Sequence, residues 1–365
     1  MRLLSRVGLI AAALLAASPV FAEDQEVIPP TEAADTARLS GMVEDALKAA
    51  HLFGMRPAMR DAHAKAHGCV KGTFTIDANI PDHLRAGIFA TSAEYPAWIR
   101  YSNGAGTPHD DANGDGRGMA VKLMGVPGDK VLTGVPEAEK DTQDFVMINY
   151  PVFFIRDVAD YATFMEQSLH RKSDEFLSTH AHEKSIIDAI TSMTVDQVFE
   201  QQYYSMSAYR LGDGYMKFSA RPIVCDTGEA IAESTVPAPT DDPNYLRAGM
   251  VSWLGEKDAC FRFAIQKQTD PAAQPIEDPT IVWDETAAPF VDVATIRIPR
   301  QTFDSEAQLT FCENLSFTPW HAVTDQRPVG GINRLRRDIY VAISNLRHAL
   351  NKAVTAEPTG DETFN

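Results

Sequence analysis

Short β-type runs separated by turn-rich segments occupy the first half of the chain and return near its end. The runs lie at 72–76, 97–102, 119–125, 145–149, 215–224, 260–268 and 293–299. Helical patterns mark 37–52, 157–203 and 332–351. Because short strands joined by turns favour antiparallel pairing, and no linker interrupts the pattern, the sequence predicts one α+β domain around an antiparallel core.

The first 22 residues have the features of an export signal. Arg2 and Arg6 precede the apolar run "VGLIAAALLAA", and Val20-Phe21-Ala22 is typical of a cleavage site. The apolar run is shorter than a membrane span requires. We therefore expect an exported, periplasmic protein whose mature chain lacks a membrane span; a retained N-terminal anchor is the alternative.

Composition suggests three further regions in the mature chain. Residues 23–36 are rich in proline and acidic residues, which predicts disorder. Residues 37–351 form the predicted folded domain, and 352–365 a flexible tail. The formal net charge of -17 disfavours binding to nucleic acid or to anionic membranes, since both repel a negative surface.

The four cysteines occur in no CxxC or CxxCH motif, which argues against a thioredoxin-type site and against covalent haem attachment. They allow three full disulfide pairings or four buried thiols. The segment "DANGDG" (111–116) matches half of a calcium loop, but Lys122 stands where a glutamate ligand is needed. We interpret it as an acidic turn.

The stretch "RDAHAKAHG" places His63 and His67 four residues apart. On a helix this spacing suits a metal-binding pair. In a strand or loop the two rings need not share a site, so one could be catalytic and the other a bystander. The local sequence leaves these alternatives open.

The last predicted helix carries Arg336, Tyr340 and Arg347 at offsets of 0, 4 and 11 residues. At about 100° per residue these positions fall within roughly 40° of one another, on one face. A guanidinium beside a phenol favours the phenolate. A phenolate is a ligand for ferric haem. A second arginine on the same face suits an anionic group such as a haem propionate.

Five motifs in order resemble those of the haem catalases, over roughly residues 55–350. They are the Arg336/Tyr340/Arg347 pattern, Arg60-x-x-His63-Ala64-Lys65, "WIRYSNG" with Arg100 and Ser102, "GRGMAVKL" (116–123) and "YPVFFIRD" (150–157) with Phe153. In its short length the chain is similar to the catalase-related peroxidases. The resemblance implies an antiparallel β-barrel with surrounding helices and a buried haem b.

The resemblance also implies roles for single residues. Tyr340 would ligate the iron. His63 would be the catalytic acid–base group, with Ser102 fixing its tautomer. The cofactor-binding residues would be Arg60, Arg100, Arg336, Arg347 and Phe153. His67 has no counterpart in the motif, which favours a bystander.

Two positions depart from the family pattern. Catalases carry a peroxide-orienting asparagine three residues before the proline of the fifth motif, where this chain has Ile148; Asn149 follows one residue later. One step along a strand reverses the side chain, so Asn149 is a catalytic candidate only if a bulge redirects it. The second departure is Ala62, which replaces a valine beside His63 and leaves more room.

These features predict a haem-dependent peroxidase that reduces hydrogen peroxide or organic hydroperoxides, with weak catalase activity. Its electron donor is unknown, and a homo-oligomer is compatible with the sequence. The alternatives are a hydroperoxide isomerase or lyase acting on lipid hydroperoxides, and a non-catalytic haem-binding protein of the cell envelope.

Overall fold

The computed structural model describes residues 25–135, 141–232 and 241–364. The predicted export signal lies outside these residues. The helices are α1 (Glu32–Leu52), α2 (Val158–Leu169), α3 (Ser173–Leu177), α4 (Ala181–Ser192), α5 (Tyr245–Glu256), α6 (Glu306–Asn314) and α7 (Gly331–Asn351). The strands are β1 (Ala66–Ile76), β2 (Glu94–Asn103), β3 (Arg117–Met124), β4 (Thr142–Ile148), β5 (Tyr203–Tyr204), β6 (Tyr209–Leu211), β7 (Gly214–Ile223), β8 (Ala259–Lys267) and β9 (Phe290–Ile298).

The strands form one antiparallel sheet in the order β5-β4-β3-β2-β1-β9-β8-β7-β6. A further pairing between β5 and β7 joins the two sides of the sheet. Eight strands thus close into a barrel, while the short β6 extends β7. The predicted antiparallel β-barrel with surrounding helices is confirmed.

The barrel interior is filled by aromatic side chains that alternate along the strands. The Phe145 ring lies 4.7 Å from the Phe263 ring, 5.0 Å from that of Phe218 and 5.7 Å from that of Phe74, measured between centroids. All four side chains are buried. Residues between them point outward, because strand side chains alternate with a period of two.

On the outward face, β2, β3 and β4 present three rows of paired residues. The rows are Ser102–Gly118–Ile148, then Arg100–Ala120–Val146, then Trp98–Lys122–Asp144. The first two rows face a cavity, and the third row lies against the C-terminal segment of the chain.

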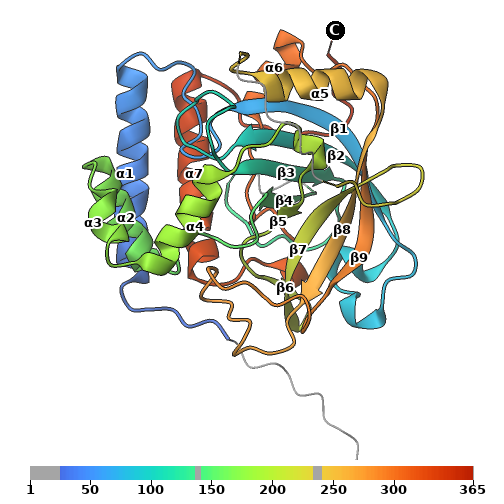
Figure 1. Ribbon diagram of the computed structural model, residues 1–365, viewed down its shortest axis with the longest axis horizontal. Coiled ribbons are helices and arrows are strands. Elements are labelled where there is room, and N and C mark those ends of the chain that lie inside the picture. Colours follow the sequence, from blue (N-terminus) through green and yellow to red (C-terminus); the bar gives the residue numbers. More distant parts are fainter. Residues whose placement is uncertain (1–24, 136–140, 233–240, 365) are drawn as a thin grey trace, which may run out of the picture.

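Helices α1, α2 and α7 pack together beside the barrel (Figure 1). Leu39 and Val43 of α1 share a buried cluster with Leu335 and Ile339 of α7 and Ala162 of α2. These residues recur every three or four positions, the spacing of one helix face. Helix α7, which carries the Arg336/Tyr340/Arg347 pattern, is thereby packed against α1 and α2.

Parts of both ends that the composition predicts to be irregular make specific contacts within the described residues. Helix α1 already begins at Glu32. The carboxylate of Glu26 pairs with Arg334 at 2.8 Å and with Arg327 at 2.5 Å. Near the other end, the Phe364 ring lies 5.0 Å from the Phe311 ring. Specific partners far along the chain order both segments despite their polar composition.

A buried ionic cluster fastens the C-terminal segment to the barrel. The Lys122 ammonium lies 2.9 Å from an Asp144 oxygen and 2.6 Å from a Glu357 oxygen, and all three side chains are buried. Burial alone would lower the pKa of Lys122, but the two carboxylates raise it, so the lysine stays charged. Thr142 also donates a hydrogen bond to Glu357, at 2.9 Å.

The cysteines form two disulfides, Cys69–Cys312 and Cys225–Cys260. Within the described residues no helix is long and apolar enough to cross a membrane.

Replacing Lys122 by methionine should lower the free energy of unfolding by about 3–5 kcal/mol, because two carboxylates would stay buried without their cation. Urea unfolding followed by circular dichroism measures this. Lys184→Met is the matched control, since Lys184 pairs with Asp188 on the exposed surface, and it should change the free energy little. A loss as small as that of the control would contradict the assigned role of Lys122.

Candidate active site

A cavity of about 740 Å³ lies between the outward face of β2, β3 and β4 and helix α7. Helices α1 and α2 supply part of its apolar wall. Of the nine candidate residues predicted from the sequence, eight line this cavity. They are Arg60, His63, Arg100, Ser102, Phe153, Arg336, Tyr340 and Arg347.

His63 lies in a segment held by backbone pairing rather than in a helix. Its φ of 57° is in the left-handed region, which costs a non-glycine residue about 1–2 kcal/mol. Three hydrogen bonds oppose this cost. The His63 N–H donates to the Gly104 carbonyl at 2.9 Å, and the Ala64 N–H donates to the Ala105 carbonyl at 3.1 Å. The Arg100 side chain donates to the His63 carbonyl at 2.8 Å. The backbone therefore fixes where the imidazole enters the cavity.

The imidazole is oriented by β2 and by the close approach of β3. Its Nδ1 lies 3.1 Å from Ser102 Oγ. A Cβ atom at Gly118 would lie 2.6 Å from His63 Nδ1 and 2.7 Å from Ser102 Oγ. Only glycine leaves room for this pair.

Asp115 organises the loop that holds His63, a role the sequence analysis did not find. One of its carboxylate oxygens accepts hydrogen bonds from the N–H groups of Gly104 and Ala105, each at 2.9 Å, and lies 3.0 Å from His109 Nε2. The acidic turn at 111–116 was the available signal. Its contacts lie within an irregular loop, where sequence spacing does not show which groups meet.

His63 is neutral in this setting. Burial, followed by the charge of Arg100, lowers the pKa of His63 to about 4. The ring is therefore a free base above about pH 5.

His67 is fully buried away from the cavity lining. Its Nε2 lies 3.0 Å from Asn103 Oδ1, and burial lowers its pKa to about 3. The two histidines have different partners and share no face. Among the described residues no group of three or more His, Cys, Asp or Glu could hold a metal ion.

On α7, Arg336 donates a hydrogen bond from Nη2 to the Tyr340 hydroxyl at 2.9 Å. Burial alone would lower the pKa of Arg336, but the phenols of Tyr340 and Tyr209 raise it, so the guanidinium keeps its charge beside the phenol. The contact predicted from the four-residue spacing is present.

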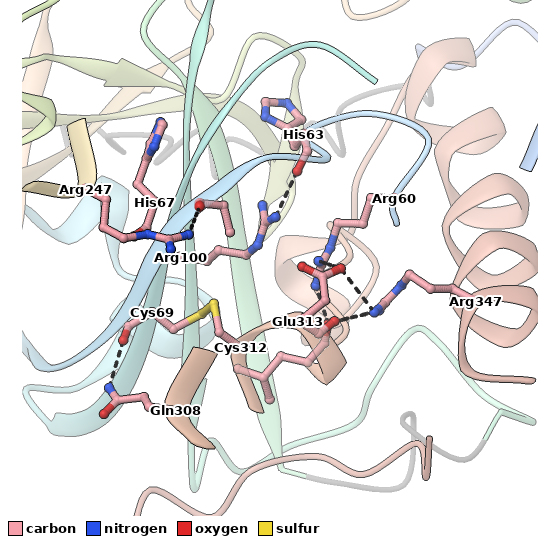
Figure 2. The surroundings of a disulfide bond; sticks show 12 residues. Arg60, His63, His67, Cys69, Arg100, Arg247, Gln308, Cys312, Glu313 and Arg347 are labelled. Carbon is pink, nitrogen blue, oxygen red and sulfur yellow. Dashed lines mark hydrogen bonds and ion pairs between the residues drawn. A yellow bond between two sulfur atoms is a disulfide. The ribbon is translucent and has the colours of Figure 1, made fainter. Parts of the chain in front are cut away.

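The other three arginines gather near the C-terminal end of α6 (Figure 2). Arg60 donates to Glu313 Oε1 at 2.9 Å and to the Leu315 carbonyl at 2.6 Å. Arg347 donates to the Glu313 and Leu315 carbonyls. The Nε of Arg100 is buried without a hydrogen-bond partner. Such an atom indicates room for an acceptor that the protein does not supply.

Asn149 is the candidate that the structure does not bring to the cavity. The register of β3 and β4 runs unbroken from Gly118–Ile148 to Met124–Thr142, so no bulge redirects it. Ile148 lines the cavity instead. Asn149 Oδ1 accepts a hydrogen bond from the Arg117 N–H at 2.6 Å, a structural contact between the strand ends.

The residues present fit the b-type haem that the family resemblance implies. Tyr340 offers a phenolic oxygen to ferric iron from α7. Arg60, Arg100 and Arg347 offer guanidinium donors to two propionates, and the buried Nε of Arg100 lacks an acceptor. A largely apolar cavity of about 740 Å³ is in the range of cofactor sites.

Comparisons with known proteins give matches to catalases and related proteins. A protein-family model described as Catalase matches residues 44–328. The chain is 24% identical to a catalase-related peroxidase of Mycolicibacterium paratuberculosis, covering 84% of this chain and 94% of that protein. It is 22% identical to a catalase of the Onchocerca volvulus endobacterium, covering 76% of this chain but only 58% of the relative. A linolenate 9R-lipoxygenase of Nostoc is also 22% identical, covering 68% of this chain and 32% of that protein.

Solved structures show the same fold. Catalase A from Saccharomyces cerevisiae superposes with a TM-score of 0.64 at 20% identity, covering 87% of this chain and 67% of that one. A bacterial catalase gives a TM-score of 0.63 at 16% identity, covering 85% of this chain and 62% of the bacterial one. The chain thus spans about three fifths of several proteins it matches.

Gly118→Ala should displace the His63 ring and lower the free energy of unfolding by about 1–3 kcal/mol, because the added methyl overpacks the His63–Ser102 contact. A crystal structure and a denaturation curve measure both effects. Gly255→Ala is the control, since no atom lies within 4 Å of its added Cβ in α5, and it should be neutral or stabilising. An undisturbed His63–Ser102 contact in Gly118→Ala would refute the packing argument.

Proposed function

We propose that this chain, which belongs to the catalase family, is a haem-dependent peroxidase that reduces hydrogen peroxide or organic hydroperoxides. The observation that carries the proposal is the placing of a neutral, oriented His63 and an arginine-paired Tyr340 in one cavity. The catalase-related peroxidase of similar length supports the choice within the family.

The reaction transfers two electrons and two protons from a donor to the hydroperoxide, giving an alcohol (or water) and a second water. Haem bound through Tyr340 would supply the redox-active iron for cleavage of the O–O bond. Arg60, Arg100 and Arg347 would hold its propionates.

His63 would perform the proton transfers. With Nδ1–H donating to Ser102 Oγ, its Nε2 has a free lone pair to accept the proton of the hydroperoxide. The same nitrogen then delivers that proton to the leaving oxygen. Because the pKa of His63 is lowered to about 4, the base form prevails at neutral pH, and activity should fall as the pH approaches 4.

We also propose export to an oxidising compartment. Two disulfides in the described residues support this, because such bonds persist outside the cytoplasm. The donor is then a reductant of that compartment.

His63→Ala should lower hydroperoxide-dependent dye oxidation per bound haem by about 100-fold or more, because it removes the acid–base group. Haem content should hardly change, since His63 is not a proposed ligand. His67→Gln is the control, and its activity per haem should stay near wild type. Equal losses in both variants, or unchanged activity in His63→Ala, would reject His63 as the proton-transfer group. Activity no higher than that of free haem in both the wild type and His63→Ala would favour a non-catalytic haem protein.

Dye oxidation should exceed oxygen release from hydrogen peroxide, measured on one preparation. Oxygen release requires a second small peroxide held accurately, and Ile148 supplies no hydrogen bond to it. A misplacement of about 1 Å can cost about 100-fold. Ile148→Asn should shift the ratio towards oxygen release. Oxygen release far above dye oxidation in the wild type would contradict the proposal.

A hydroperoxide isomerase or lyase is the second candidate. The similarity to the Nostoc linolenate 9R-lipoxygenase and the apolar cavity wall support it. Incubation with a fatty-acid hydroperoxide separates the two. An alcohol with oxidised donor indicates a peroxidase, and rearranged or cleaved products formed without a donor indicate the isomerase or lyase.

A further inference from the structure

The disulfide Cys69–Cys312 lies directly beside the arginines of the cavity (Figure 2). In the barrel, Cys69 of β1 is the register partner of Arg100 of β2. Both cysteines are buried, at 0% and 1% exposure. The bond thus joins the strand position next to Arg100 to the C-terminal turn of α6.

The next residue after Cys312 is Glu313, which contacts two of the arginines. Its Oε1 lies 2.9 Å from Arg60 Nη1 and 3.6 Å from Arg347 Nη1. Its carbonyl also accepts a hydrogen bond from Arg347. The carbonyl of Leu315 then accepts from Arg60 at 2.6 Å and from Arg347 at 3.2 Å. The segment that follows the disulfide therefore sets the direction of both guanidiniums.

The positive and negative charges of the three arginines and Glu313 do not cancel. Arg60, Arg100 and Arg347 bring three positive charges and Glu313 brings one negative charge, which leaves two. Burial and the charges of Arg60 and Arg347 lower the pKa of Arg100, while the negative charge of Glu313 acts to raise it. An excess of two positive charges matches a ligand with two carboxylates, as haem b has.

We propose that Glu313, anchored by the Cys69–Cys312 disulfide, is a positioning residue that holds Arg60 and Arg347 for the two carboxylates of the cofactor. Whether this cysteine pair is oxidised to the disulfide or reduced to two thiols then sets how tightly the cavity retains haem. The inference rests on the proposed function, since it assumes that haem is the ligand.

Reduction by a dithiol would break the S–S bond, leave two thiols and oxidise the dithiol to its disulfide. Other contacts would keep α6 near its place. Gln308 donates to the Cys69 carbonyl at 2.9 Å, and His348 Nε2 lies 2.8 Å from the Asn314 carbonyl. The expected result of reduction is thus a looser arginine cluster, with the fold retained.

The test is the rate at which haem leaves the loaded protein for an excess of apomyoglobin. The double variant Cys69→Ser/Cys312→Ser should release haem about tenfold faster, the size expected for loss of groups that orient ligand-binding residues. The matched control is Cys225→Ser/Cys260→Ser. It removes the other disulfide, whose Cys260 is the register partner of Ile223 and Arg297 rather than of a cavity residue, and should release haem at the wild-type rate.

Glu313→Gln tests the positioning role with both disulfides intact, so that it stands even if the double variant fails to fold. It should also speed haem release about tenfold, and Glu313→Asp should restore part of the retention. Equal rates in the wild type, the Cys69/Cys312 variant and Glu313→Gln would overturn the inference alone. A wild-type protein that binds no haem would overturn the proposed function, and this inference with it.

Discussion

The unbroken register of β2, β3 and β4 determines which side chains reach the cavity. Because side chains alternate along a strand, Ser102, Gly118 and Ile148 share one outward row and Arg100 shares the next with Ala120 and Val146. A slip of one residue would move every one of them to the barrel interior. The aromatic packing of the opposite face makes such a slip costly, so the core of the barrel fixes the chemistry of its outer surface.

The same constraint explains the one candidate that does not reach the cavity. With no bulge, Asn149 follows Ile148 on the other side of the ladder and bonds the Arg117 backbone. The cavity lining therefore includes an imidazole, a hydroxyl and guanidiniums, with the apolar side chain of Ile148 at the position where the haem-catalase pattern has an asparagine. Ala62 adds room beside His63. In the proposed reaction both changes would relax the placement of a small peroxide and leave His63 in place as the acid–base group.

Much of the site could be predicted from local sequence. The spacing of Arg336, Tyr340 and Arg347 was sufficient because a helix converts spacing into a face, and the strand runs were sufficient because turns bounded them. Asp115, Glu313 and Glu357 could not be found in this way. Glu313 and Glu357 act through contacts with residues far along the chain, Asp115 acts within an irregular loop, and none of the three lies in a periodic pattern. The contacts of the two ends could not be predicted for the same reason, since composition does not reveal the partner of Glu26 or Phe364.

The proposed ligand of the haem iron in this cavity is Tyr340. The most direct measurement is an absorption titration of the purified protein with haem, repeated on Tyr340→Phe. We expect saturation at one haem per chain in the wild type, with charge-transfer bands of a phenolate-bound ferric iron that are lost or shifted in the variant. Identical spectra and stoichiometry for the two proteins, or no saturable binding by the wild type, would contradict this assignment.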